Sequence, residues 1–288
     1  MTLIVQSLAP LAASDIDMLR QLAGAPGLTQ ISETVARAEL SSEPRADGSD
    51  GLRDALDDWC GPRGIDWAIV PGNRQLSDFR LVAMDMDSTL ITIECIDEIA
   101  DFCGLKAEVS AITEAAMRGE ITDFNESLRR RVALLKGLDA SVLDRVYAER
   151  LRLSPGAERM LEAVRAAGLR TLLVSGGFVH FTGQLQSRLQ LDFTRANTLE
   201  IVDGKLTGQV LGEIVNAEVK ARTVLETCAA IGARPEQAIV MGDGSNDLKM
   251  MAVAGLSVAF RAKPVVRAKA DVAFNHVGLD GLLSLFPV

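Results

Sequence analysis

The sequence has few of the features that mark secreted, disulfide-bonded or thiolate-metal proteins. Its four cysteines are scattered, and none lies in a Cys-x-x-Cys pair or beside a histidine. The apolar residues 1–13 have no Lys or Arg before them, so the basic start of a signal peptide is missing. We therefore interpret Cys60, Cys95, Cys103 and Cys228 as reduced thiols, and we expect a cytoplasmic protein.

Basic charge and long apolar runs are also scarce. The formal net charge is −9, which argues against general binding of nucleic acid, because a phosphate backbone needs a basic surface. No apolar stretch reaches the roughly 18 residues of a membrane-spanning helix. A small phosphorylated substrate needs only a local basic pocket, so the charge does not exclude one. We expect neither nucleic acid nor a membrane as a partner.

The composition is instead typical of a globular protein with more than one unit. The chain has 288 residues, of which 48% are hydrophobic and 24% charged. In residues 1–76 the patterns predict the order β-α-β(β)-α-β, which fits a small ferredoxin-like α+β module. The predicted elements are a strand at 3–8, a helix capped near Ser14, one or two strands in 28–40, a loop at 41–51, a helix at 51–60 and a strand at 65–70. A linker at 71–78 follows.

The second unit, residues 80–288, alternates strands with helices. A buried strand at 81–84 precedes a helical block at about 94–152, which we interpret as a cap inserted over the end of that strand. The cap helices are predicted at 97–102, 108–117, 124–136 and 141–150. Further strands are predicted at 169–174 and 238–241, a hairpin at 199–210, and helices at 155–167, 178–190, 217–231 and 248–254. The alternation predicts an α/β fold with a doubly wound, mostly parallel sheet.

Two carboxylates directly follow the first strand of this unit. Asp85 and Asp87 are spaced i, i+2, so in an extended chain both side chains point to the same side. They follow the carboxyl end of a buried strand, where open α/β sheets bind ligands. A solvated acidic turn is the alternative, but a surface turn has no need of two acids abutting a core strand. We therefore predict a site here.

Later parts of the chain bring further polar groups to the same edge of the predicted sheet. Because the carboxyl ends of parallel strands meet at one edge, these groups can converge on the two acids. A serine hydroxyl and a glycine N–H can hold phosphate oxygens, since glycine permits close approach. The residues concerned are Ser175, Gly176, Lys220, Asp243 and Asp247.

This combination suits the attack of a carboxylate on a phosphomonoester. Two like unit charges about 4 Å apart repel by roughly 4 kcal/mol at an effective dielectric of ~20, and a dianion doubles that cost. Asp85 and Asp243 offer hard oxygen ligands for Mg²⁺, and Lys220 offers a compact positive charge. Asp87 is suited to protonate the leaving alcohol and later to activate water.

Each of these features has a plainer explanation when it is taken alone. A Ser-Gly-Gly sequence is more often a turn than a phosphate cradle, and a lone lysine on an amphipathic helix is usually solvated. Residues 243–247 superficially resemble a calcium loop, but Leu248 and Ala254 stand where such a loop needs Gly and Glu. His180 and His276 lie far from any ligand pattern, and we interpret both as structural. It is the convergence of several groups that favours a catalytic site.

The motifs resemble those of the haloacid dehalogenase-like phosphatases. Asp85-Met86-Asp87-Ser88-Thr89 resembles the DxDxT signature of that superfamily, and residues 174–178, Lys220 and residues 242–247 match its later motifs in order and spacing. The resemblance implies an aspartyl-phosphate on Asp85, with Asp87 as general acid and base. It also implies Mg²⁺ held by Asp85, the backbone carbonyl of Asp87 and Asp243, with Asp247 in support, and a helical cap after the first strand.

Within this superfamily the chain is most similar to the phosphoserine phosphatases. The similarity lies in residues 94–100 and in the run 124–132. It implies hydrolysis of O-phospho-L-serine, the last step of serine biosynthesis. Glu94 would meet the substrate ammonium group and Arg131 its carboxylate, Phe124 would close over the site, and Asn246 would be a further substrate-binding residue. A zwitterionic head group does need one fixed anion and one bidentate cation. The alternative for three consecutive arginines is a solvated helix face.

Residues 1–76 are similar to the ACT-like regulatory modules of longer phosphoserine phosphatases. We hypothesise that this unit forms a homodimer or responds to serine. Two other functions stay open for the whole chain. One is a related phosphatase or phosphotransferase acting on another small phosphoester, and the other is a non-catalytic sensor of amino acids.

Overall fold

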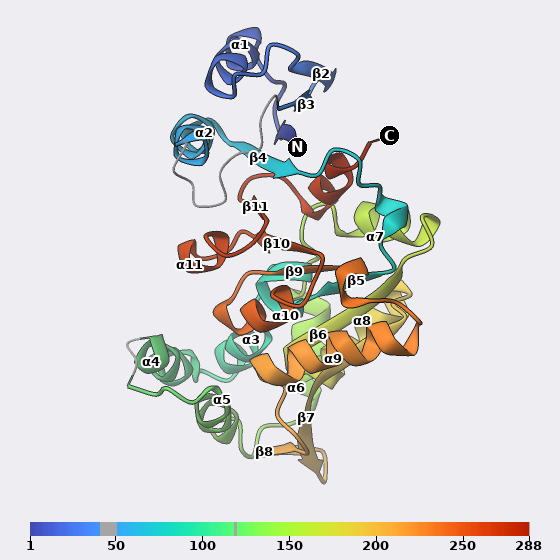
Figure 1. The fold of residues 1–288 in the computed structure, drawn as a ribbon. Helices are drawn as coiled ribbons and strands as arrows, with labels where there is room; N and C mark the ends of the chain where they lie inside the picture. Colours follow the sequence, from blue (N-terminus) through green and yellow to red (C-terminus); the bar gives the residue numbers. More distant parts are fainter. Residues whose placement is uncertain (41–50, 118–119, 288) are drawn as a thin grey trace.

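The computed structural model describes residues 1–40, 51–117 and 120–287, which form two sheets (Figure 1). The smaller sheet contains β1 (Thr2–Ser7), β2 (Thr29–Ser32), β3 (Val35–Glu39) and β4 (Ile65–Val70). Its order is β2-β3-β1-β4, and every neighbouring pair is antiparallel. In Figure 1 this sheet and its helices lie at one end of the molecule, and the cap lies at the other.

The larger sheet has seven strands in the order β11-β10-β9-β5-β6-β7-β8. All neighbouring pairs are parallel except β7 and β8, which form an antiparallel hairpin. The carboxyl ends of the parallel strands therefore share one edge, as the sequence predicts. The strands are β5 (Leu81–Met84), β6 (Arg170–Phe178), β7 (Phe193–Val202), β8 (Lys205–Leu211), β9 (Ala238–Gly242), β10 (Leu256–Phe260) and β11 (Val272–Phe274).

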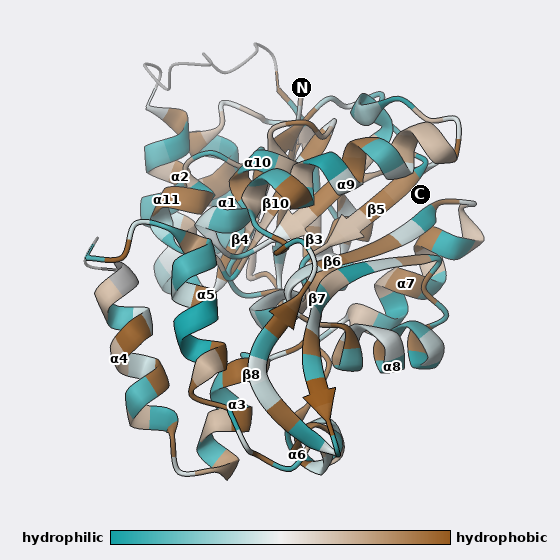
Figure 2. Cartoon of the chain, turned by 90° about the horizontal axis from the view of Figure 1, so that it is seen from below, coloured by the Kyte–Doolittle hydropathy of each residue, from teal (hydrophilic) through white to brown (hydrophobic). Residues whose placement is uncertain are grey.

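The central strand β5 is buried on both of its faces. Val82 and Met84 belong to one hydrophobic cluster, and Leu81 and Ala83 belong to another, because successive strand residues face opposite sides of a sheet. Helices α7 (Ala157–Ala166) and α8 (Val179–Leu189) pack in the first cluster. The second cluster contains α9 (Ala217–Ala230), α10 (Leu248–Met251) and α11 (Pro264–Arg267). Figure 2 shows β5 in brown shades, whereas α5 and α9 carry teal segments.

The cap follows β5 and consists of four helices. They are α3 (Cys95–Phe102), α4 (Lys106–Met117), α5 (Phe124–Ala133) and α6 (Ser141–Arg145), the last continuing into a π-helical turn at Val146–Arg150. The segment after α5 is bonded to the β7–β8 hairpin, since Gly137 N–H donates to Leu206 O and Ala140 N–H donates to Gly204 O, both at 2.8 Å. The hairpin of the core thus holds one end of the cap.

The N-terminal sheet is also covered on both faces. Leu3 and Val5 of β1 pack against α1 (Ala13–Leu22) and α2 (Leu52–Cys60), whereas Ile4 faces the cluster of the larger unit. Asp66 of β4 is 1% exposed, and its carboxylate accepts hydrogen bonds from the N–H groups of residues 275, 276 and 277 at 2.8–2.9 Å. The N-terminal unit is therefore docked on the larger one through both apolar and polar contacts.

The predicted order of elements in the larger unit is confirmed, with corrections at several ends. The predicted cap at Ser14 is wrong, because α1 begins at Ala13 and Ala12 at its N-cap makes no side-chain hydrogen bond. Helix α5 ends three residues early, where Gly137 turns the chain at φ +85° toward the hairpin. Helix α10 is short because the chain turns at once into β10. Strand β6 continues through the Ser-Gly-Gly sequence with an irregular register.

The predicted loop at 41–51 falls almost entirely on residues 41–50, which lie outside the described residues. In the part of the chain that the structure describes, no helix is long and apolar enough to cross a membrane.

Candidate active site

Asp85 is the first residue after β5, and both of its carboxylate oxygens are held. The backbone stays extended there (φ −70°, ψ 161°), so the side chain sits at the carboxyl end of the strand. Oδ1 accepts a hydrogen bond from the N–H of Met86 at 2.7 Å, and Oδ2 lies 2.8 Å from Nζ of Lys220. The side chain is 5% exposed and lines a cavity. Its position is therefore fixed by the strand, the following peptide and one buried cation.

The next residues form a tight turn that links the strand to the cap. Ser88 has a φ of 55°, in the left-handed region that is unusual for a residue other than glycine. Its hydroxyl donates to Oε1 of Glu94 at 2.7 Å, and the hydroxyl of the buried Thr89 donates to Oδ1 of Asp243 at 3.2 Å. Asp87 Oδ1 accepts from the N–H of Cys95 at 3.3 Å. One turn is thus bonded to the start of α3, through Glu94 and Cys95, and to Asp243 after β9.

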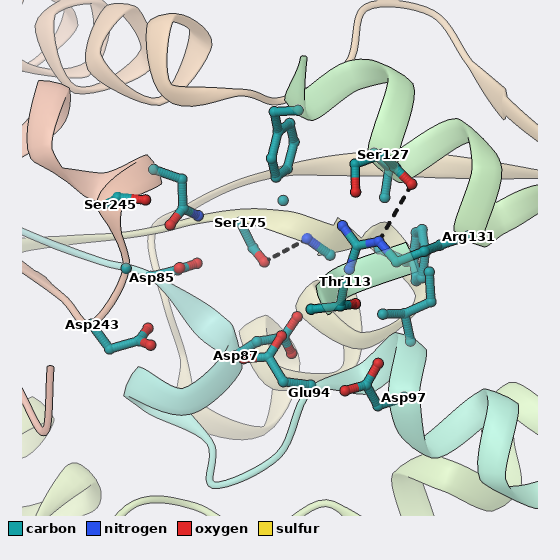
Figure 3. Close-up of a pocket in the computed structure, with 18 of the residues that line it drawn as sticks. Asp85, Asp87, Glu94, Asp97, Thr113, Ser127, Arg131, Ser175, Asp243 and Ser245 are labelled. Carbon is teal, nitrogen blue, oxygen red and sulfur yellow. Dashed lines mark hydrogen bonds between the residues drawn. The ribbon is translucent and has the colours of Figure 1, made fainter. Parts of the chain in front are cut away.

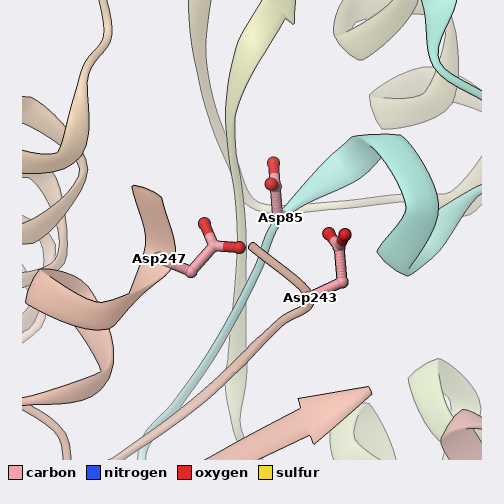
Figure 4. Close-up of side chains that lie close together, drawn as sticks. All are labelled: Asp85, Asp243 and Asp247. Atoms are coloured by element: carbon pink, nitrogen blue, oxygen red, sulfur yellow. The ribbon is translucent and has the colours of Figure 1, made fainter. Parts of the chain in front are cut away.

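Three carboxylates gather behind this turn, as Figure 4 shows. One oxygen from each of Asp85, Asp243 and Asp247 lies within 4.8 Å of the others. Asp247 is fully buried, and both of its oxygens have protein partners, Lys220 Nζ at 2.7 Å and the N–H of Gly244 at 3.0 Å. Asp85 and Asp243 face the cavity. Hard carboxylate oxygens that converge in this way are the donor set that Mg²⁺ prefers.

The charge balance of the cluster shifts the pKa values of its members. Burial would lower the pKa of Lys220, but Asp247 and Asp85 outweigh that effect and raise it, so the ammonium group stays protonated. Burial and the neighbouring Asp247 raise the pKa of Asp85, against the effect of Lys220. Burial and Asp247 also raise the pKa of Asp243 to about 7. One lysine does not balance the charges of the buried Asp85 and Asp247 and the half-buried Asp243, whereas a lysine together with a divalent cation would.

Asp87 lies in a different environment and faces the cap. Burial, followed by the charge of Glu94, raises the pKa of Asp87 to about 7. A carboxyl group with that pKa can both hold and release a proton near neutral pH, which is what acid–base catalysis requires. Glu94 itself has a raised pKa because of burial, although the hydrogen bond from Ser88 opposes the shift.

The segment after Val174 brings backbone close to Asp87 and Phe124. Ser175 is 1% exposed, and its Oγ accepts a hydrogen bond from the N–H of Gly177 at 2.8 Å (Figure 3). A Cβ atom on Gly177 would stand 2.9 Å from Oδ2 of Asp87, and one on Gly176 would stand 3.1 Å from Cζ of Phe124. Because glycine has no Cβ atom, these close contacts are avoided and the backbone here can approach a ligand in the cavity.

The cap supplies a cation and an aromatic ring to the same cavity. Arg131 on α5 is half-buried and its Nε donates to Ser127 O at 3.4 Å, whereas Arg129 and Arg130 are exposed. Burial lowers the pKa of Arg131, and the carboxylates of Asp97 and Glu94 oppose that shift. In Figure 3 the guanidinium group points toward the acids of the core.

The cavity has a volume of about 510 Å³ and collects most of the residues that the sequence predicts. Those that line it are Asp85, Asp87, Glu94, Phe124, Arg131, Ser175, Gly176, Asp243 and Asn246. Lys220 and Asp247 do not line it but lie fully buried behind Asp85. Lys220 is therefore not the solvated helix residue that its local sequence favours.

Several lining residues were not among the predicted site residues. Asp97 and Thr113 come from the cap, and Lys263 follows β10. Asp97 lies within the segment 94–100, which is similar to the phosphoserine phosphatases. Its place in that segment could have predicted that it lines the site. Nothing in the local sequence of Thr113 or Lys263 distinguishes them from other surface residues.

Comparisons with known proteins show the family of this chain. Residues 79–255 match the profile of the haloacid dehalogenase-like hydrolases, and residues 3–47 match a domain of unknown function. A phosphoserine phosphatase from a Polaromonas species is 60% identical over 221 residues, which are 75% of this chain and 94% of that protein.

Two crystal structures are similar to almost the whole chain. A haloacid dehalogenase family hydrolase from Salmonella enterica superposes with a TM-score of 0.88 at 33% identity, covering 99% of this chain and 98% of that one. A probable phosphoserine phosphatase from Vibrio cholerae superposes with a TM-score of 0.81 at 37% identity, covering 99% of this chain and 86% of that one.

Proposed function

This chain belongs to the haloacid dehalogenase-like hydrolase family, and we propose that it is a Mg²⁺-dependent phosphatase that hydrolyses O-phospho-L-serine to L-serine and inorganic phosphate. One observation carries the proposal. The buried, lysine-paired carboxylate of Asp85 faces the same cavity as the cation of Arg131 and the carboxylate of Glu94. The phosphoserine phosphatase with which the chain shares 60% identity supports the choice of substrate.

Asp85 is the nucleophile in this proposal. Its carboxylate attacks the phosphorus atom of the substrate, the bond from phosphorus to the serine oxygen breaks, and an aspartyl-phosphate forms. Water then attacks the phosphorus atom and releases Asp85 and phosphate. Lys220 Nζ lies 2.8 Å from Asp85 Oδ2 and so reduces the repulsion between the carboxylate and the phosphate dianion. Ser175 and Gly176 hold phosphate oxygens.

Asp87 moves the protons in both steps. In the first step its carboxyl group gives a proton to the departing serine oxygen, and in the second step its carboxylate takes a proton from the attacking water. A pKa of about 7 makes both forms available near neutral pH. The two acids thus divide the chemistry, and the difference in their partners, Lys220 against Glu94, supports that division.

Asp85, the backbone carbonyl of Asp87 and Asp243 would hold Mg²⁺, and Asp247 would support them. Bound Mg²⁺ supplies positive charge that favours binding of the phosphate dianion near the carboxylates. Asp247 suits a supporting role because it is fully buried and, unlike Asp85 and Asp243, does not line the cavity. Thr89 orients Asp243 through the hydrogen bond to Oδ1.

The cap selects the serine part of the substrate. Glu94 binds the ammonium group, Arg131 binds the carboxylate, and Phe124 covers the site above Gly176. Asn246, which also lines the cavity, is a further substrate-binding residue. An arginine can bind a carboxylate through two parallel hydrogen bonds, which gives orientation as well as affinity.

Release of phosphate from O-phospho-L-serine tests the proposal. The purified full chain should release phosphate with Mg²⁺ and lose the activity with a chelator. A panel of other small phosphoesters and of alcohol acceptors tests the related activities. Faster turnover of a different phosphoester, or transfer of phosphate to an alcohol in place of water, would contradict the proposed substrate or reaction.

For residues 1–76 we propose a role in forming a homodimer or in the response to serine. The edge strand β2 is exposed along its length, and the side chain of Ile31 is 51% exposed. Deletion of this unit is a poor test, because it would uncover apolar residues of the larger unit that pack against Ile4 and Ala68. Light scattering of the full chain and of Ile31→Lys tests the role in dimerisation. Phosphate release by both proteins, with and without L-serine, tests the response to serine. An unchanged mass and unchanged serine inhibition in the variant would contradict them.

A further inference from the structure

The side chain of Asn197 on β7 joins two segments of backbone that flank the cavity. It is 1% exposed. Its Nδ2 donates to the carbonyl oxygen of Gly176 at 2.8 Å, and its Oδ1 accepts from the N–H of Val215 at 2.8 Å. Because one partner is an acceptor and the other a donor, only one orientation of the amide satisfies both. No other residue type of this size and neutral charge offers this pair of groups.

The bond to Gly176 fixes one end of a single peptide group. That peptide consists of the carbonyl of Gly176 and the N–H of Gly177. The N–H donates to Oγ of Ser175 at 2.8 Å, so the two ends of the peptide are held by Asn197 and Ser175. If the peptide rotated, Ser175 would lose the donor that now occupies one of its lone pairs.

The hydrogen bond from Gly177 favours a donor role for the hydroxyl group of Ser175. A hydroxyl group has one proton to donate and two lone pairs to accept with. Since the N–H of Gly177 fills one lone pair of Ser175, the hydroxyl proton is left to donate into the cavity that Ser175 lines. A phosphate dianion is an acceptor at every oxygen, so a donor is what this position needs.

The bond to Val215 extends the network to the helix that carries Lys220. The residue after Val215 is Asn216, whose Oδ1 accepts from the N–H of Val219 at the start of α9. The Nδ2 of Asn216 donates to Oδ1 of Asn125 on α5 at 3.2 Å, beside Phe124. A continuous chain of hydrogen bonds and short backbone steps therefore connects Ser175, the start of α9 and the start of α5.

We propose that Asn197 is a positioning residue for phosphate recognition, which holds the Gly176–Gly177 peptide so that the Ser175 hydroxyl donates to phosphate and stays in register with Lys220. This rests on the proposed phosphatase function. Asn197 acts through Ser175 and touches no substrate atom itself. It should therefore affect every phosphomonoester alike, in contrast to Glu94 and Arg131, which should affect only substrates with a serine head group.

Two substitutions test the proposal in the full chain. Asn197→Asp keeps the shape and can accept from Val215, but it cannot donate to Gly176. Asn197→Ser is neutral and too short to span both partners. Both should weaken the binding of inorganic phosphate, measured by calorimetry with Mg²⁺, by about tenfold, the size expected for one lost hydrogen bond. The KM values for phosphoserine and for an aryl phosphate should rise together.

A double-mutant cycle separates positioning from general damage. If Asn197 acts through Ser175, then Asn197→Asp should have little further effect on phosphate binding in a Ser175→Ala background. Asp66→Asn is the matched control, since Asp66 is equally buried and also binds backbone groups, but far from the cavity. It should lower the midpoint of thermal unfolding and leave phosphate binding unchanged.

Three results would overturn the proposal. They are unchanged phosphate affinity in both Asn197 variants, additive losses in the Ser175→Ala background, and a loss of phosphate affinity in Asp66→Asn equal to that in Asn197→Asp. If O-phospho-L-serine is not the substrate, the experiments give a result that differs from all three of these. In that case the wild-type chain would bind phosphate and hydrolyse the aryl phosphate but not phosphoserine, and the comparison of variants would still decide the role of Asn197.

Discussion

Nζ of Lys220 lies 2.8 Å from Oδ2 of Asp85, and both side chains are almost completely shielded from solvent. The same ammonium group lies 2.7 Å from Oδ1 of Asp247. A buried cation shared by two carboxylates therefore fixes the residue that we propose as the nucleophile. We therefore expect stability and catalysis to depend on the same contact.

Replacement of Lys220 should lower both the stability of the protein and its catalytic activity. Lys220→Met leaves Asp85 and Asp247 buried without their cation, so the free energy of unfolding should fall by about 3–5 kcal/mol, the usual cost of breaking a buried ion pair. Chemical denaturation measures the loss. Lys249→Met, which breaks an exposed pair with Glu218, is the control and should leave stability nearly unchanged. Equal stability of the two variants would contradict this interpretation of the buried pair.

The acid–base role of Asp87 should be visible in the pH dependence of the rate. With a pKa of about 7, the carboxyl group loses its proton as the pH rises through neutrality, so kcat/KM for phosphoserine should decline on the alkaline side. Asp87→Asn should lower kcat by about 10²–10⁴-fold and remove this alkaline decline. An aryl phosphate, whose leaving group needs no proton, should show a much smaller decline. An identical pH profile in the variant would exclude the role.

Metal binding should change how stability depends on pH. The pKa values of Asp87 and Asp243 rise from 3.8 to about 7 on folding, so the folded state binds more protons than the unfolded state between these values. The unfolding free energy contributed by these groups is therefore present at low pH and falls as the pH rises from about 4 to 7. Mg²⁺ binds the ionised acids, so it should raise the thermal unfolding midpoint more at pH 8 than at pH 5. An equal rise at both pH values would contradict the assigned ligands.

Substrate selectivity should reside in the cap. Arg131→Lys loses the bidentate geometry, and Glu94→Gln loses the negative charge, so each should lower kcat/KM for phosphoserine by about tenfold or more. Hydrolysis of an aryl phosphate should be spared in both variants. Arg130→Lys is the control, because Arg130 is exposed and pairs with Glu126 on the surface of α5. Equal losses on both substrates would assign these residues to the phosphate and not to the serine head group.

The sequence predicts the sheet, and the place of Asp85 and Asp87 at the end of its central strand, for a clear physical reason. The apolar run 81–84 predicts a buried strand, and the acids Asp85 and Asp87 that follow it directly predict a site. Both predictions therefore depend on only a few neighbouring residues. The burial of Lys220 could not be predicted in this way, because it depends on how α9 packs against β6 and α10 and on its contact with Asp85 at the end of β5. The contacts of Asn197 could not be predicted for the same reason, since both of its partners are distant in sequence.

Other properties depend on features that local patterns do not record. The early end of α5 follows from its contact with the β7–β8 hairpin, which lies about seventy residues further along the chain. The cap boundaries, the role of residues 1–76 and the cytoplasmic location stay predictions. Their tests need measurements on the protein in solution.

Trapping of the covalent intermediate tests the central claim most directly. Wild-type protein mixed with phosphoserine and Mg²⁺, then quenched in acid within milliseconds, should yield one phosphorylated peptide, which mass spectrometry should assign to Asp85. With an aryl phosphate, whose leaving group needs no proton, Asp87→Asn should accumulate more of this species, because only its hydrolysis lacks the base, and Asp85→Asn should yield none with either substrate. A phosphoryl group on another residue, or phosphate release by Asp85→Asn at the wild-type rate, would contradict the account.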